Sequence, residues 1–474
     1  MVEERRATTD LDTSRASQRG SRIIRVSRIL DLKEQTKLFF QRKLTFMQGL
    51  VFIFVQFYIV GLVQGYTVSI EYILQEKGAT YADQTKFSLI SYPYSYKFFV
   101  SPFMDRFFLR NFGRSRTYTV FAGIVISVVF CFLGGFVELF IEEKRINSLV
   151  LMLACVSSVN ILIQIASEAW ILTLFSKENK SKASRMIGIG QTFGIMCGYN
   201  FFTPLNSISW VNKHFFPTNP RSTPLVTHQM FLFFAVIVVA TSVLCNVLFV
   251  AEEKINDDRT KSLCKILSIL PRSFTHANMR NLILYIFATR IFVNMCLESL
   301  QLKLIRNGYQ NMLRTDLSSI DIFVYPITLA VSCFSIKFIK QGKIINVYHW
   351  MMLVVVLVGF FKYVSFRYLI ATKDTHGTYF LLVITSIFNA FNLSTGFLIG
   401  YYNLIIDKSV ANTSITCLIA LMNQTGSLPK TLGLYLTDKV DFDHLVYFAF
   451  GTQILVLALY YPYSFVLDKR GKKE

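Results

Sequence analysis

Long apolar runs recur along this chain of 474 residues, and short polar segments separate them. An apolar run of about 18 residues or more is what a helix needs to cross the hydrocarbon core of a bilayer. Only 16% of the residues are charged, whereas an average soluble protein has about 25%. The sequence therefore predicts an all-α membrane protein, for which the usual size of soluble domains does not set the domain count.

The apolar runs predict twelve transmembrane helices in two six-helix halves. The second and eleventh spans are the least regular, because each contains a lysine and a proline (Lys97, Pro102, Pro429, Lys430). Such helices occur at membrane depth where they line protein or a watery cavity. The expected spans lie near residues 46–66, 87–104, 117–137, 148–173, 186–206, 229–251, 281–301, 317–339, 345–366, 377–402, 410–433 and 444–467.

The polar segments complete the predicted organisation. A basic N-terminal tail (1–43) precedes the first half (44–251), and a long central loop (252–280) leads to the second half (281–467) and a short C-terminal tail (468–474). The first tail is read as a solvated segment or, from Ile23 to Phe40, as an interfacial helix. It does not read as a signal peptide, so the first span is expected to direct membrane insertion.

Basic residues concentrate in the tails and in alternate loops, and the net charge is +20. This distribution fits the positive-inside rule better than a nucleic-acid-binding face, so no nucleic-acid partner is expected. Both termini are predicted to be cytosolic. The loops between the basic ones are less basic or acid-balanced, as in the segment that contains Glu71, Glu76, Lys77 and Asp83.

Two pairs of short motifs indicate an internal repeat. Gly113-Arg114 follows the second span, and Gly342-Lys343 follows the eighth, 229 residues later. Gln191-Thr192 in the fifth span has a counterpart 233 residues later in Gln424-Thr425 of the eleventh. The nearly equal offsets favour duplicated halves, as in transporters built from six plus six helices.

The stretch from Ser91 to Arg116 combines a helix, an acid at its mouth and an arginine-rich loop. An ion pair at the rim of a transporter can form in one state and break in another. The alternative is topogenic, with the arginines holding the loop in the cytosol. The candidate gating residues are Asp105, Arg106, Gly113, Arg114 and Arg116, joined by Glu168 at the end of the fourth span.

Ionisable residues inside the spans are costly and are functional candidates by default. Lys97 and Arg290 lie deep enough to bind an anionic, aromatic-bearing substrate; for Arg290 the alternative is pairing with Glu298 or Asp321. Glu168 is either a proton or ion relay or the partner of a basic residue on the first or second span. Lys430 is either a cavity residue or a snorkelling lysine. His349 is expected to be structural.

Other function classes find little support. The sequence contains no Walker loop, HExxH, GxSxG or kinase signature, and its eight cysteines show no CxxC spacing. ATP hydrolysis, covalent catalysis, a zinc site and a disulfide framework are therefore not indicated. No cofactor and no metal are expected.

Three blocks resemble the acetyl-coenzyme A transporter family, a branch of the major facilitator superfamily in the endoplasmic reticulum membrane. The first is SPFMDRFFLRNFGRSRTY, beginning at Ser101; the second runs from Ile165 to Gly194, and the third from Ile406 to Thr431. The chain departs from the family pattern at two positions. Gln164 stands where the family has an acidic residue, and Leu428 stands where it has a tryptophan.

This resemblance implies a major facilitator-type bundle that moves acetyl-CoA from the cytosol into the secretory lumen, in exchange for CoA. Acetyl-CoA is strongly anionic and carries an adenine ring. Trp170 is expected either in the interfacial aromatic belt or as a stacking platform for that ring. The implied substrate-binding set is Lys97, Arg290, Lys430, Tyr94, Trp170, Tyr199, Gln191, Asn423 and Gln424.

Three alternatives stay open. The same machine could carry another organic anion or a nucleotide conjugate. A membrane acyltransferase that uses acetyl-CoA would depend on His349, and a non-transporting scaffold or receptor would tolerate loss of the buried charges. The expected partners are the lipid bilayer and a small anionic substrate, and a homodimer is left open.

Overall fold

The computed structural model describes residues 46–109, 112–175, 177–249, 277–306, 344–372, 380, 383–384 and 411–470. Within these residues the chain is helical, without a β-strand. The helices before residue 250 are α2 (Phe46–Glu76), α3 (Tyr81–Ser88), η1 (Leu89–Ser91), α4 (Tyr92–Arg106), α5 (Arg114–Glu142), α6 (Ile146–Leu174), α7 (Lys177–Ile195), the π-helical η2 (Met196–Phe201), α8 (Phe202–Asn206), α9 (Ile208–His214) and α10 (His228–Phe249). Those after it are α13 (Ala277–Arg306), α15 (Ile344–Thr372), α18 (Ala411–Thr437) and α19 (Phe442–Arg470).

The described helices correspond to ten of the spans expected from hydropathy. The span near 317–339 and all but three residues of the span near 377–402 lie outside the described residues. Among the described residues, seven helices are long and apolar enough to cross a membrane. The chain is therefore a multi-pass membrane protein.

Two boundaries differ from the prediction in a way that matters for function. The first span does not end near residue 66, because α2 continues as a helix of 31 residues to Glu76. Glu71 therefore lies inside a helix, and its assignment to a polar loop was wrong. The second span is not one helix, since a 3-10 turn (η1) separates α3 from α4.

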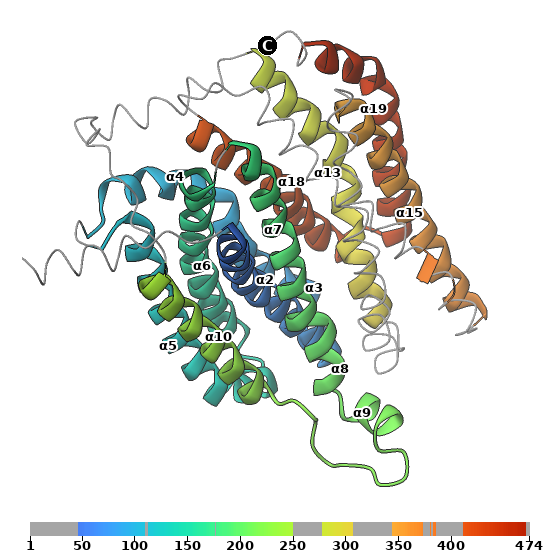
Figure 1. The fold of residues 1–474 in the computed structure, drawn as a ribbon. Coiled ribbons are helices and arrows are strands. Elements are labelled where there is room, and N and C mark those ends of the chain that lie inside the picture. The colour runs from blue at the N-terminus through green and yellow to red at the C-terminus, as the bar shows by residue number, and fades with distance from the viewer. Residues whose placement is uncertain are drawn as a thin grey trace, which may run out of the picture.

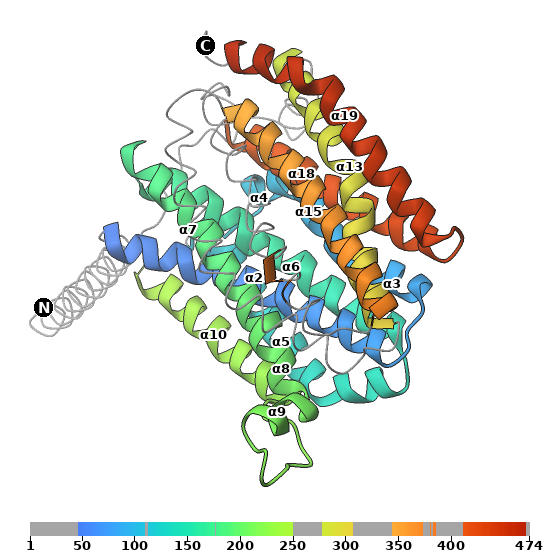
Figure 2. The ribbon, with the colours of Figure 1, turned by 90° about the vertical axis from the view of Figure 1, so that its right-hand side faces the viewer.

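The buried apolar side chains form two large clusters. One contains residues between Ile59 and Val239, and the other contains residues between Leu282 and Leu457. In both ribbon views, α13, α15 and α19 lie together on one side, while α2, α5, α6, α7 and α10 lie on the other (Figure 1, Figure 2). Helix α18 packs against α13 and also against α3 and α4, so it joins the two clusters.

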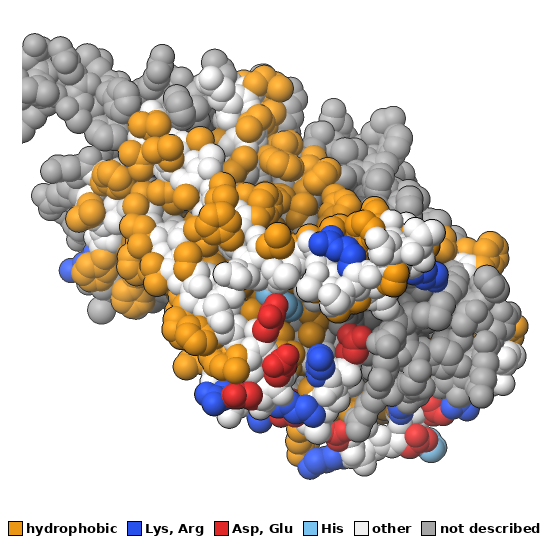
Figure 3. All heavy atoms as spheres, turned by 90° about the horizontal axis from the view of Figure 1, so that it is seen from below, with side chains coloured by type: hydrophobic (Ala, Val, Ile, Leu, Met, Phe, Trp, Pro, Cys, Tyr) orange, Lys and Arg blue, Asp and Glu red, His pale blue; other side chains and the backbone are white. Residues whose placement is uncertain are grey.

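The outer helices expose apolar side chains rather than polar ones. On α5 and α10 these include Phe121, Val128, Met230 and Phe233. Figure 3 shows one face of the molecule, where hydrophobic side chains cover a broad area and acidic and basic side chains gather in one part. Large exposed apolar surface is what a lipid-facing helix presents, because lipid tails solvate it.

Helices α2 and α7 approach each other through glycines on both sides of the contact. A Cβ atom at Gly61 would lie 2.0 Å from the backbone oxygen of Gln191, and one at Gly194 would lie 2.1 Å from that of Tyr58. Gly65 and Gly198 continue the contact one turn along. Small residues four apart let helix backbones approach closely in a membrane, and this contact fixes where α7 presents its polar side chains.

We predict that Gly194→Ala destabilises the protein by about 1–3 kcal/mol or more, because the methyl group must push the two backbones apart. Thermal unfolding in detergent measures the change. Gly188→Ala in the same helix is the matched control, since a Cβ atom there has no neighbour within 4 Å. Equal unfolding temperatures for the two variants would contradict the prediction.

Candidate functional site

A buried ion pair joins α4 to α6. The Nζ atom of Lys97 lies 2.8 Å from Oε1 of Glu168. The Lys97 side chain is fully buried, and that of Glu168 is 17% exposed. Of the two roles considered for Glu168, the structure favours the partner of a basic residue on the second span.

Further polar side chains on α2, α4, α6 and α7 bond to one another. The Nδ2 atom of Asn160 donates to the hydroxyl of Tyr94 at 2.9 Å, and Gln64 and Ser157 contact the same hydroxyl. Gln191 on α7 donates to Oε1 of Gln64 at 2.8 Å. Tyr94 and Gln191, both predicted site residues, are thus linked through Gln64.

Gln64 and Asn160 were not among the predicted site residues, although an amide inside an apolar run is itself a signal. They lie in the spans expected near 46–66 and 148–173. Each side chain bonds across helices, which compensates for its removal from water. Polar groups on α2, α4, α6 and α7 therefore form one connected layer.

Helix α18 meets this layer at Asn423, whose Nδ2 donates to the backbone oxygen of Tyr94 at 3.3 Å. On its other side, Asn294 of α13 donates to the backbone oxygen of Thr425 at 3.0 Å. Gln424 lies between Asn423 and Thr425 in the sequence and is half-buried. The predicted amides of the eleventh span therefore lie where the two apolar clusters meet.

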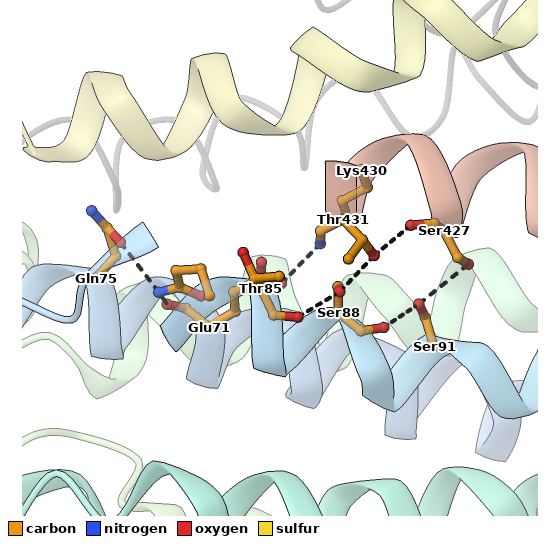
Figure 4. A network of polar contacts seen from close by, with 9 residues as sticks. Glu71, Gln75, Thr85, Ser88, Ser91, Ser427, Lys430 and Thr431 are labelled. Carbon is orange, nitrogen blue, oxygen red and sulfur yellow. Dashed lines mark hydrogen bonds and ion pairs between the residues drawn. The ribbon is translucent and has the colours of Figure 1, made fainter. Parts of the chain in front are cut away.

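A second buried ion pair and a row of hydroxyls continue the contact of α18 with the first cluster (Figure 4). Lys430 Nζ lies 3.0 Å from Oε2 of Glu71. Ser88 and Thr431 are joined by a hydroxyl–hydroxyl hydrogen bond of 2.7 Å, and Ser91 and Ser427 by one of 3.2 Å. We call these six residues the α18 clasp. Lys430 is thus neither at a helix end in lipid nor exposed to solvent.

Arg290 on α13 is half-buried and has no ion pair among the residues that the structure describes. Glu298 lies eight residues further along the same helix, and its side chain is outside the described part of the structure. Asp321 lies outside the described residues. Beside Arg290, Gln453 of α19 donates to the backbone oxygen of Ala288 at 3.1 Å.

The two aromatic site residues Trp170 and Tyr199 differ in their burial. Trp170 is 1% exposed and packs edge-on against Phe52 with 4.8 Å between ring centroids. The expectation that it belongs to the interfacial belt was wrong, because it lies in the protein interior. Tyr199, on the π-helical η2, is half-buried and lies 5.4 Å from the ring of Tyr72, in a small cluster that includes Leu302 of α13. π-Helical turns are frequent at functional sites.

The gating candidates lie between α4 and α5. Asp105 is in the last turn of α4, but its side chain is outside the described part of the structure, and Arg106 is exposed. Gly113 has a φ of 89°, a left-handed conformation that glycine adopts without strain, and Arg114 begins α5. Arg116 is buried, so for this arginine a purely solvated, topogenic position is excluded.

The arrangement of the helices is similar to that of solved structures. The structure matches the fucose:proton symporter of E. coli with a TM-score of 0.57 over 90% of this chain and 99% of that one, at 12% identity. It matches a D-xylose–proton symporter with a TM-score of 0.57 over 87% of this chain and 95% of that one, also at 12% identity. A second structure of the fucose:proton symporter, FucP, described as a major facilitator superfamily transporter in the outward conformation, matches with a TM-score of 0.56 over 87% of this chain and 99% of that one, at 12% identity. The fold is that of major facilitator superfamily transporters.

A match to a family model is more specific than the similarity of fold. Residues 49–265 match the family model described as "Acetyl-coenzyme A transporter 1". This confirms the resemblance to the acetyl-coenzyme A transporter family over the segment that contains α2 to α10.

Two fungal relatives accompany this match. An uncharacterized protein of Schizosaccharomyces pombe is 25% identical over 425 residues, covering 86% of this chain and 76% of its own length. An uncharacterized membrane protein of Saccharomyces cerevisiae is 29% identical over 161 residues, which is 29% of this chain and 27% of that protein.

We predict that loss of Lys430, in the α18 clasp, destabilises the protein more than loss of Lys86. Lys430→Met is expected to lower the free energy of unfolding by about 3–5 kcal/mol, because it leaves the buried Glu71 without its lysine. Lys86→Met is the matched control: Lys86 pairs with Asp83 at the exposed start of α3, where loss of an ion pair costs about 1 kcal/mol or less. Chemical or thermal unfolding in detergent compares the two, and an equal effect would show that the buried pair contributes no more than a surface pair.

Proposed function

We propose that this protein is a secondary transporter that carries acetyl-CoA from the cytosol into the lumen of the secretory pathway, in exchange for CoA. The match of residues 49–265 to the acetyl-coenzyme A transporter family carries the proposal. That segment contains the buried ion pair of Lys97 and Glu168, and it contains Tyr94 and Gln191 of the polar layer. The major facilitator fold supports alternating access by two six-helix halves, residues 44–251 and 281–467, in a bundle of twelve helices.

The chemistry of acetyl-CoA agrees with the polar residues between the two clusters. Its phosphates need cations, for which Lys97, Arg290 and Lys430 are the candidates. Amides such as Asn423 and Gln424 can bond its polar groups, and Tyr199 offers an aromatic ring. Trp170 has almost no exposed surface in this conformation, so we assign it to packing.

In the described conformation, one end of the helix bundle is closed. The α18 clasp joins the two clusters at the end of α4 opposite Arg106. With both termini in the cytosol, as the basic loops favour, this closed end faces the lumen. Asp105 and Arg114, at the other end of α4 and the start of α5, are then the candidates for the cytosolic gate. We place the protein in the endoplasmic reticulum on the family match.

Two other functions lead to different expectations. A carrier of another organic anion would use the same cations but would not exchange acetyl-CoA. An acyltransferase would need a reactive histidine in contact with substrate, whereas His349 is buried and its Nδ1 lies 2.8 Å from the hydroxyl of Tyr285. The hydrogen bond and burial support a structural histidine.

Counterflow in proteoliposomes tests the substrate. Vesicles loaded with CoA are expected to accumulate labelled acetyl-CoA faster than vesicles loaded with buffer, because exchange avoids the return of an empty carrier. Vesicles loaded with ATP or citrate are the controls for other nucleotide and organic anions. Robust exchange of one of these without uptake of acetyl-CoA would assign the transporter to a different substrate.

Cross-linking tests the closed end. The double variant Ser88→Cys/Thr431→Cys replaces two hydroxyls whose oxygens lie 2.7 Å apart, so the two thiols would lie close enough to be oxidised to a disulfide. Oxidation is expected to abolish exchange, and a reducing agent is expected to restore it. Each single cysteine variant controls for the native cysteines. Undiminished exchange after complete cross-linking would show that this end does not open during transport.

A further inference from the structure

We propose that the carboxylate of Glu168 is an internal substitute for the substrate: it neutralises Lys97 in the empty transporter, and an anionic group of the substrate replaces it on binding. Glu168 would then determine whether the empty protein can return across the membrane. This inference rests on the proposed transport of an anion, and it adds a role that the proposed exchange does not require.

The first step is the cost of the lysine. Lys97 is fully buried, and its Nζ pairs with Glu168 at 2.8 Å. A buried ammonium without a nearby anion is strongly unfavourable. To stay charged throughout the transport cycle, Lys97 therefore needs an anion in every state, whether the substrate or Glu168 supplies it.

The second step is the place of the pair in the fold. Lys97 on α4 and Glu168 on α6 both belong to the part of the chain before residue 250, and α4 packs directly on α6. Rigid-body rocking of two halves leaves such a pair intact. The pair between Lys430 and Glu71 differs, because it connects α18 to α2 and must separate when that end opens.

The third step is access. Tyr94 lies one turn before Lys97 on α4, and its backbone oxygen accepts a hydrogen bond from Asn423 of α18. The pair thus lies one helical turn from the contact between the two clusters, where a substrate held between the halves would lie. Glu168 retains 17% of its side-chain exposure, and one of its oxygens holds the lysine. An ammonium has three donors and tolerates a new anion more easily than a bidentate arginine does.

The proposal separates two transport modes. Exchange needs Lys97 but not Glu168, because a substrate anion is present during both crossings. Net flux needs both residues, because the empty carrier crosses with only Glu168 to neutralise the lysine. Wild-type protein should therefore show net flux in addition to exchange.

The experiment measures net efflux and counterflow of labelled acetyl-CoA in the same proteoliposomes. Glu168→Gln is expected to reduce net efflux about tenfold or more, because the empty state then contains an uncompensated buried cation. Counterflow should persist with a lower KM, since the competing carboxylate is gone. Glu168→Asp should retain both modes, and Lys97→Gln should lose both. Glu143→Gln, which alters a surface ion pair with Arg145, is the matched control.

A second variant keeps the test independent of the folding of Glu168→Gln. Lys97→Arg retains the cation but can hold Glu168 through two parallel hydrogen bonds. It is expected to raise the KM for exchange several-fold, because the substrate must displace a stronger internal contact.

Several outcomes would overturn the inference. They are an absence of net flux in the wild type, full net flux in Glu168→Gln, a parallel loss of both modes in folded Glu168→Gln protein, or an unchanged KM in Lys97→Arg. The failure of the proposed function is distinguishable from these, since wild-type protein would then exchange neither acetyl-CoA nor CoA.

Discussion

The need to neutralise lysines buried among membrane-spanning helices constrains the rest of this structure. Lys97 and Lys430 each meet a carboxylate from a different helix, Glu168 and Glu71 respectively. In a low-dielectric interior such a pair offsets the desolvation of its charges only with close geometry. The pairs therefore fix the positions of four helices, α2, α4, α6 and α18, and the neighbouring amides and hydroxyls complete the contacts that these positions allow.

The sequence predicted the helices better than their contacts. Hydropathy located every described long helix, because a span must be apolar over a length that the bilayer sets. The sequence left Glu168 either as a proton or ion relay or as the partner of a basic residue on the first or second span, and the structure pairs Glu168 with Lys97 of the second. It missed Glu71 as the partner of Lys430, since a window tuned to one bilayer thickness ends the first span too early, whereas α2 continues to Glu76. Trp170 was misplaced because an indole suits both an interface and an interior, and only its packing on Phe52 decides between them.

Glycine packing explains why the polar layer is so compact. Gly61 and Gly194 bring the backbones of α2 and α7 into contact, which places Gln64 and Gln191 within hydrogen-bonding distance of each other. On the side of the second cluster, Gly433 of α18 has a similar role, because a Cβ atom there would lie 1.8 Å from the backbone oxygen of Met295 on α13. Each side thus contains a close, glycine-mediated contact between two helices. A sequence alone shows these glycines but does not show which helix each one faces.

The two ion pairs differ in what can break them. The pair of Lys430 and Glu71 links α18 to α2, so any opening of that end separates its charges, and the hydration of both charges then compensates for the lost contact. The pair of Lys97 and Glu168 lies between helices of a single cluster, so opening alone neither separates nor hydrates it. In the proposed transport cycle, a competing anion releases Glu168 from Lys97. One pair would then respond to conformation and the other to occupancy. Coupling between them would require a link such as Asn423, which bonds to Tyr94 one turn from Lys97 and lies two turns from Lys430 on the same helix.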